Sequence, residues 1–156
     1  MLKLLFISDF SESFTNKILK GIVNYSSQRG QWSICRMPSY YKNTIGIEGV
    51  IKWAKVWGTD AVIGTFENKE EVCMLKNEGI AVIAQDYKKM FDNVPNITAD
   101  YIGTGRMAAS YFIDRGFQNF GFFGLNDVCW SDGRCDGFRK EVEDNGFGNT
   151  FFKYNL

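Results

Sequence analysis

The sequence contains no histidine, only two prolines and no excess of either charge. Without histidine, the Ser-His-Asp and Cys-His arrangements of hydrolytic enzymes are excluded in their usual form. The 18 Lys and Arg residues are balanced by 18 Asp and Glu residues, so no broad basic face exists to attract a phosphate backbone. The chain is therefore not expected to bind DNA by itself.

Metal-binding and membrane-spanning patterns are also missing. The four cysteines are widely spaced and form no Cys-x-x-Cys pair: Cys35, Cys73, Cys129 and Cys135. In the absence of histidine, we expect no metal site. The apolar run at residues 2–7 contains Lys3 and is too short for a secretion signal or a membrane span. We therefore expect a cytoplasmic protein without membrane contact, whose cysteines stay reduced.

Short apolar runs alternate with segments of helical period along the 156 residues, which suffice for one compact domain. Strand-like runs lie at residues 2–7, 32–37, 61–64, 80–84, 96–98, 120–124 and 151–152. Helices are expected at residues 14–29, 47–57, 70–78, 101–115 and 132–144. This alternation predicts an α/β fold in which a doubly wound parallel sheet carries helices on both faces.

The candidate site follows from the ends of the predicted strands, because ligands of open parallel sheets bind beyond the carboxyl ends. Asp9 and Phe14 follow the first strand, Asp86 follows the fourth, and Trp130 and Arg134 follow the run at 120–124. Carboxylates and an Arg can bond pairs of hydroxyls, and aromatic rings pack on C–H faces. These five residues predict a binding site for a small polyol.

A nucleotide cofactor is the first alternative. Residues 103–108 fit Gly-x-Gly-x-x-Ala, and Asp127 follows about twenty residues later. The fingerprint requires a hydrophobic strand directly before the glycines, whereas residues 95–100 are short and polar. We therefore expect no cofactor, and we interpret the small residues as allowing this helix to approach the sheet closely.

Catalysis is the second alternative. Asp9 with Asp86, or Asp127 with Asp132, could form a carboxylate pair. No nucleophile or matched base accompanies either pair, so the chain is not expected to be an enzyme. The spacing of Trp130 and Arg134 alone is also compatible with a surface loop that binds no ligand. In such a loop the Arg side chain would lie along the surface and keep its charge in water.

The second half of the chain carries four features in a fixed order, namely an Asp, a small-residue helix ending in Gly, a strand and an Arg-x-x-Gly-aromatic loop: Asp100–Gly103, Ala108–Phe117, Phe120–Gly124 and Arg134–Phe138. In this order and spacing the chain resembles the lactose-repressor (LacI/GalR) family of sugar sensors. The Trp-x-x-x-Arg segment at Trp130–Arg134 is closer still to the xylose-operon regulators of the AraC type, known as XylR.

The resemblance implies the ligand-sensing domain of a bacterial transcription regulator, with a periplasmic-binding-protein-like fold that closes on a monosaccharide such as xylose. Arg134 would bond sugar hydroxyls, and Trp130 would supply a stacking face. Residues 1–156 would form the N-terminal lobe of two, and the second lobe and the DNA-binding domain would be absent. A truncated gene product or an isolated part of a longer regulator is expected, with DNA contacted only by that separate domain.

A homodimer through this lobe is also expected. Trp53 and Val56 lie off the apolar stripe of the helix at 47–57, and they would leave apolar surface exposed. The alternative function is a fragment of a nucleotide- or sugar-dependent α/β enzyme, and flavodoxin-like signalling domains share the predicted architecture.

Overall fold

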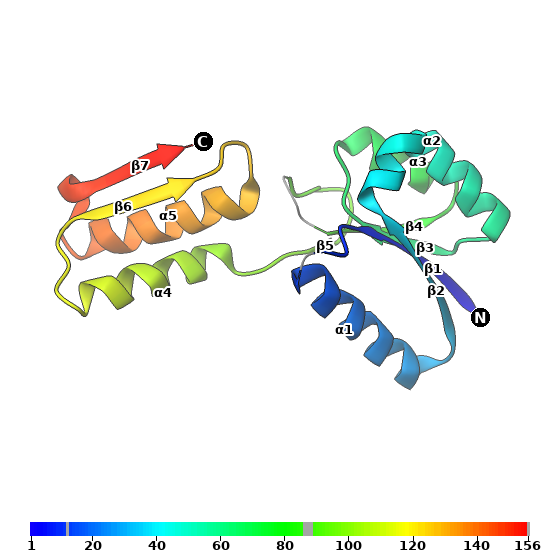
Figure 1. Cartoon of the computed structure of the whole chain (residues 1–156), viewed down its shortest axis with the longest axis horizontal. Coiled ribbons are helices and arrows are strands. Elements are labelled where there is room, and N and C mark those ends of the chain that lie inside the picture. Colours follow the sequence, from blue (N-terminus) through cyan, green and yellow to red (C-terminus); the bar gives the residue numbers. More distant parts are fainter. Residues whose placement is uncertain (12, 86–88, 156) are drawn as a thin grey trace. The chain divides into compact units, whose positions relative to one another are not determined.

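The structure is a computed structural model that describes residues 1–11, 13–85 and 89–155. The chain divides into two compact units (Figure 1). The first unit comprises Met1–Gln85 and Phe91–Ile97, and the second unit is formed mainly by the residues from Thr98 onward. Each unit has its own hydrophobic core, where the sequence predicts one lobe over residues 1–156.

The first unit is a five-stranded sheet with three helices. Its elements are β1 (Leu2–Ser8), α1 (Ser13–Arg29), β2 (Trp32–Pro38), α2 (Ser39–Trp57), β3 (Ala61–Gly64), α3 (Lys69–Asn77), β4 (Ala81–Gln85) and β5 (Asn96–Ile97). The strand order is β2-β1-β3-β4-β5, and every neighbouring pair is parallel. The chain thus winds outward to β2 and then returns past β1 to β3, so the predicted doubly wound parallel sheet is confirmed.

Helices cover both faces of this sheet, as predicted. Because strand side chains alternate in direction, β1 contributes to two clusters. Leu4 and Phe6 pack with Ile22 of α1, whereas Leu5 and Ile7 pack with the buried side chains of α2 and α3. Figure 1 shows α1 on one side of the sheet and α2 and α3 on the other.

Helix α2 differs from the predicted helix at both its start and its exposed face. It begins at Ser39, and Gly46, with φ 68° and ψ 172°, interrupts it before the predicted apolar stripe starts. Trp53 is not left exposed, because it packs against the core cluster and lies 5.3 Å from the Trp57 ring. Val56 is 87% exposed, as expected. Of the two residues expected to be exposed on this helix, Val56 is exposed and Trp53 is not.

The second unit is a parallel pair of strands with two helices on one face. Its elements are α4 (Tyr101–Ile113), β6 (Phe120–Gly124), α5 (Cys129–Asp144), the 3-10 helix η1 (Gly148–Thr150) and β7 (Phe151–Asn155). The core consists of Ala109, Phe120, Phe138 and Val142. Helix α5 begins three residues before its predicted start, so Trp130 is helical rather than part of a loop.

The other face of β6 and β7 is open in the part of the chain that is described. The register pairs Gly121 with Phe152 and Phe123 with Tyr154, and the three aromatic side chains of this face are all exposed. Helices thus cover both faces of the first unit's sheet, whereas within the described residues they cover one face of β6 and β7.

Glycines set the contact between α4 and α5. A Cβ atom on Gly105 would overlap the carbonyl oxygen of Arg134, and one on Gly137 would overlap the carbonyl oxygen of Ile102. The small residues of the Gly-x-Gly-x-x-Ala segment therefore allow α4 to approach another helix, and the predicted role in helix–sheet packing is wrong for Gly105. The reason is that two backbones meet here, which requires glycine on both sides.

We predict that Gly137→Ala destabilises the second unit by about 1 to 3 kcal/mol, because the new methyl group has no space against backbone atoms. Amide hydrogen exchange of α4 and α5 would measure this change in the second unit alone. Gly21→Ala is the matched control, because nothing lies within 4 Å of its added Cβ on α1. Unchanged exchange in Gly137→Ala would contradict the close helix contact.

Candidate ligand-binding residues

The carboxyl ends of β1 and β4 in the first unit are tied together by a closed ring of hydrogen bonds. Ser8 Oγ donates to Gln85 Oε1 over 3.1 Å and lies 2.9 Å from Thr15 Oγ1, while Gln85 Nε2 donates to Thr15 Oγ1 over 3.4 Å. Because the Ser8 proton is used toward Gln85, the Thr15 hydroxyl donates to Ser8. All three side chains are buried, so the ring fixes the positions from which the adjacent loops begin.

Asp9 follows this ring directly and is exposed. Its Oδ1 atom accepts hydrogen bonds from the Ser11 hydroxyl at 2.7 Å and the Ser11 backbone N–H at 2.9 Å. These bonds, the hydroxyl first, lower the pKa of the Asp9 carboxyl below its ordinary value. The carboxylate is thus ionised at neutral pH and can accept further hydrogen bonds from solvent or a ligand.

Aromatic residues accompany Asp9 in the same segment. Phe14 lies in the first turn of α1 and is 37% exposed. Phe10, which the sequence analysis does not single out, stacks edge-to-face on Phe6 at 5.5 Å, and the Arg36 guanidinium lies 5.2 Å from its ring centroid. Asp9 and Phe14 therefore lie in one short segment, which connects β1 to the first turn of α1. Asp86 lies outside the described residues.

A buried ion pair joins the first turns of α2 and α3. Lys42 Nζ lies 2.9 Å and 3.2 Å from the two carboxylate oxygens of Glu71, and the Lys42 side chain is only 3% exposed. Glu71 also accepts the Glu67 backbone N–H at 2.9 Å, and Asn68 caps α3. The two charges neutralise each other within the protein, so neither offers a free ionic contact to a ligand.

Trp130 and Arg134 come together in the second unit. The Arg134 guanidinium carbon lies 5.1 Å from the Trp130 ring centroid and equally 5.1 Å from that of Tyr101. All three side chains are partly buried, which argues against a surface loop with a solvated Arg. Among the described residues, no acceptor is hydrogen-bonded to this guanidinium. Its N–H donors are therefore available to a ligand.

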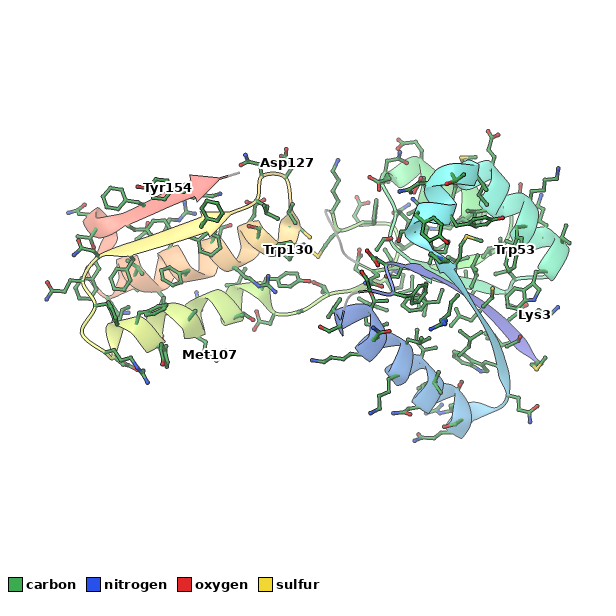
Figure 2. The ribbon with its side chains drawn as sticks, in the orientation of Figure 1. Lys3, Trp53, Met107, Asp127, Trp130 and Tyr154 are labelled. Carbon is green, nitrogen blue, oxygen red and sulfur yellow. The ribbon has the colours of Figure 1, made fainter. Side chains whose placement is uncertain are left out.

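The loop before Trp130 is held by a buried serine. Ser131 Oγ accepts the Leu125 backbone N–H at 2.9 Å. Asp127, with φ 57°, is the one non-glycine residue at positive φ in the described ranges. Figure 2 shows Asp127 in this loop and Trp130 at the start of α5. A tight turn thus leads from β6 into the helix that carries Arg134.

The cofactor alternative finds no support at the start of α4. Asp100 caps this helix, because its Oδ1 atom accepts the Gly103 backbone N–H at 2.8 Å. A pyrophosphate would have to displace this bond and would be repelled by the carboxylate. Within the described ranges, no three Cys, Asp or Glu side chains are grouped to hold a metal ion. No helix there is long and apolar enough to span a membrane.

Some of these additional residues occupy positions that can be recognised in the sequence. Ser8 and Gln85 are the first polar residues after apolar strand runs. Tyr101 directly follows the capping Asp100. Arg36 and Lys42 lie in a segment without a clear pattern, and only the fold gives them partners.

Comparison with known proteins identifies the fold but no sequence family. No family model and no curated protein matches the sequence. The transcription regulator CcpA of Lactococcus lactis is similar in structure, with a TM-score of 0.75 at 13% identity over 100% of this chain and 60% of that one. The Caulobacter myo-inositol binding protein, bound to myo-inositol, gives 0.72 at 17% identity over 99% of this chain and 56% of that one.

A third similar structure is CCPA of the LacI family from Weissella paramesenteroides with bound glucose. It gives a TM-score of 0.72 at 16% identity over 99% of this chain and 58% of that one. The chain thus has the fold of LacI-type regulators and periplasmic sugar-binding proteins and spans less than two thirds of these neighbours. These neighbours are named as regulators and a sugar-binding protein, and at these identities the likeness shows the fold of the chain.

We predict that Thr15→Val lowers the unfolding free energy of the first unit by about 1 to 3 kcal/mol, because Gln85 and Ser8 lose a buried partner at unchanged side-chain volume. Urea unfolding followed by tryptophan fluorescence would measure this change, because three of the four tryptophans, Trp32, Trp53 and Trp57, lie in the first unit. Thr44→Val is the control, since Thr44 is exposed and its hydroxyl donates to the Tyr40 carbonyl oxygen within the same helix. Equal effects of both changes would contradict the importance of the ring.

Proposed function

We propose that the chain is part of a sugar-sensing regulatory domain of a bacterial transcription regulator. The observation that supports this most is Arg134, which two aromatic rings hold while its guanidinium donors have no protein acceptor among the described residues. A planar fork of N–H donors beside aromatic surface is suited to a neutral molecule that carries neighbouring hydroxyls. Two of the similar structures contain bound myo-inositol and bound glucose, respectively.

The two compact units refine the proposed domain organisation. The first unit, with its complete doubly wound sheet, has the architecture proposed for the N-terminal lobe. The second unit repeats only the opening strand–helix–strand step of such a sheet, as β6, α5 and β7. We infer that the lobe boundary lies near Ile97 and Thr98, and that the second unit is the first portion of the other lobe.

The proposed ligand is a monosaccharide, and xylose is the first one to test because of the Trp-x-x-x-Arg resemblance. Arg134 would donate to sugar hydroxyls, and Trp130 and Phe14 would contribute apolar ring surface. Asp9 would accept hydrogen bonds from sugar hydroxyls, and Asp86 remains a predicted contact. DNA would be contacted through a separate domain, which places the proposed regulator in the cytoplasm. No geometry described above favours the enzyme alternative.

We predict that Arg134→Lys weakens sugar binding about tenfold to a hundredfold, because a Lys ammonium cannot form the two-pronged contact and hydroxyls lose partners. NMR titration of the chain with D-xylose and D-glucose at millimolar concentrations would measure this, since a partial site should bind weakly. Arg139→Lys is the control on the same helix, because Arg139 is already paired with Asp136 at 2.8 Å. Equal affinities for all three proteins would remove Arg134 from the site.

We also propose that the chain self-associates through the first unit. Val56, an apolar residue of α2 that is 87% exposed, supports this proposal. Val56→Asp should shift light scattering toward monomer at high micromolar concentration, because a carboxylate at the contact must lose its hydration. Val23→Asp on α1, on the other face of the sheet, is the control. A strictly monomeric wild-type protein would refute this proposal.

A further inference from the structure

Arg134 is held by two rings that come from different helices. Trp130 lies one helical turn before it on α5, whereas Tyr101 is the first residue of α4. Both ring centroids lie 5.1 Å from the guanidinium carbon, within the range of a cation–π contact. The orientation of the guanidinium therefore depends on how α4 is placed against α5.

The backbone of both helices sets that placement. The Cβ of a residue at 133 would lie only 3.0 Å from Tyr101 Cβ, so Gly133 gives the Tyr101 side chain its space. Gly105 gives space to the Arg134 carbonyl oxygen on the other side of the same contact. The helix that carries the ring and the residue that carries the charge are thus in direct backbone contact, which leaves little freedom for either.

We propose that Tyr101 is a positioning residue for the sugar contact of Arg134. Its ring and that of Trp130 together hold the guanidinium in one orientation. In that orientation the N–H donors are directed toward the ligand. The inference rests on the proposed function, because the sugar supplies the acceptors. It also assigns Trp130 a second role, since the ring face that meets Arg134 is not available for stacking on a sugar.

The test compares Tyr101→Leu, Tyr101→Phe and the double variant Tyr101→Leu with Arg134→Lys, using the full 156-residue chain and D-xylose. Tyr101→Leu removes the ring and should weaken binding about threefold to tenfold, the size of one cation–π contact. Tyr101→Phe retains the ring and should restore most of the affinity. In the Arg134→Lys background, Tyr101→Leu should have little further effect, because the residue acts through Arg134.

Tyr111→Leu is the matched control. Tyr111 lies on the same helix, and the Arg115 guanidinium is stacked 3.5 Å from its ring, so the control removes a similar contact outside the site. It should leave D-xylose affinity unchanged. An equal loss in Tyr111→Leu, no loss in Tyr101→Leu, or additive losses in the double variant would each overturn the positioning role while the wild type still binds sugar.

A second readout needs no ligand. In the wild type, the ring currents of Tyr101 and Trp130 should shift the Arg134 side-chain proton signals upfield, and Tyr101→Leu should move them back toward ordinary values. Absence of this change would show that the ring does not hold Arg134. If the change is present but the wild type binds neither D-xylose nor D-glucose, the proposed function fails, and the sugar-positioning role fails with it.

Discussion

Backbone contact between α4 and α5 determines the geometry of the second unit. Gly105 and Gly137 each face a carbonyl oxygen of the other helix at a separation that leaves no space for a side chain. Such contact fixes the relative translation of two helices more tightly than interdigitated side chains would. The positions of Tyr101, Trp130 and Arg134 all follow from it, since these residues lie in the first two turns of the two helices.

The first unit obtains rigidity at the carboxyl ends of its strands in another way. Its sheet is parallel throughout, so the carboxyl ends of β1 and β4 lie at one edge with one strand between them. The ring of Ser8, Thr15 and Gln85 joins these ends through buried hydrogen bonds. A buried polar group without a partner is unfavourable, so the closed ring restrains where each strand ends and where each loop starts.

Much of the fold could be predicted from the sequence, because parallel strands buried on both faces appear as short apolar runs, such as Ala61–Gly64. The boundary at Thr98 could not, since the polar stretch at residues 95–100 looks like an ordinary loop and both units share the same βαβ pattern. Arg134 could be predicted from its position after a strand. Tyr101 could not, because its contact joins residues 33 positions apart and depends on glycines whose motif also fits a nucleotide site.

The charges of Lys42 and Arg134 are held in two different ways. Lys42 is neutralised by Glu71 in a buried pair, and an ammonium already bonded to a carboxylate cannot be recruited by a neutral sugar, whose hydroxyls are weaker acceptors. Arg134 instead lies against aromatic faces, which attract the cation without occupying the in-plane N–H donors. An aromatic clamp thus orients a guanidinium and preserves its hydrogen-bonding capacity, and that combination is what recognition of an uncharged polyol requires.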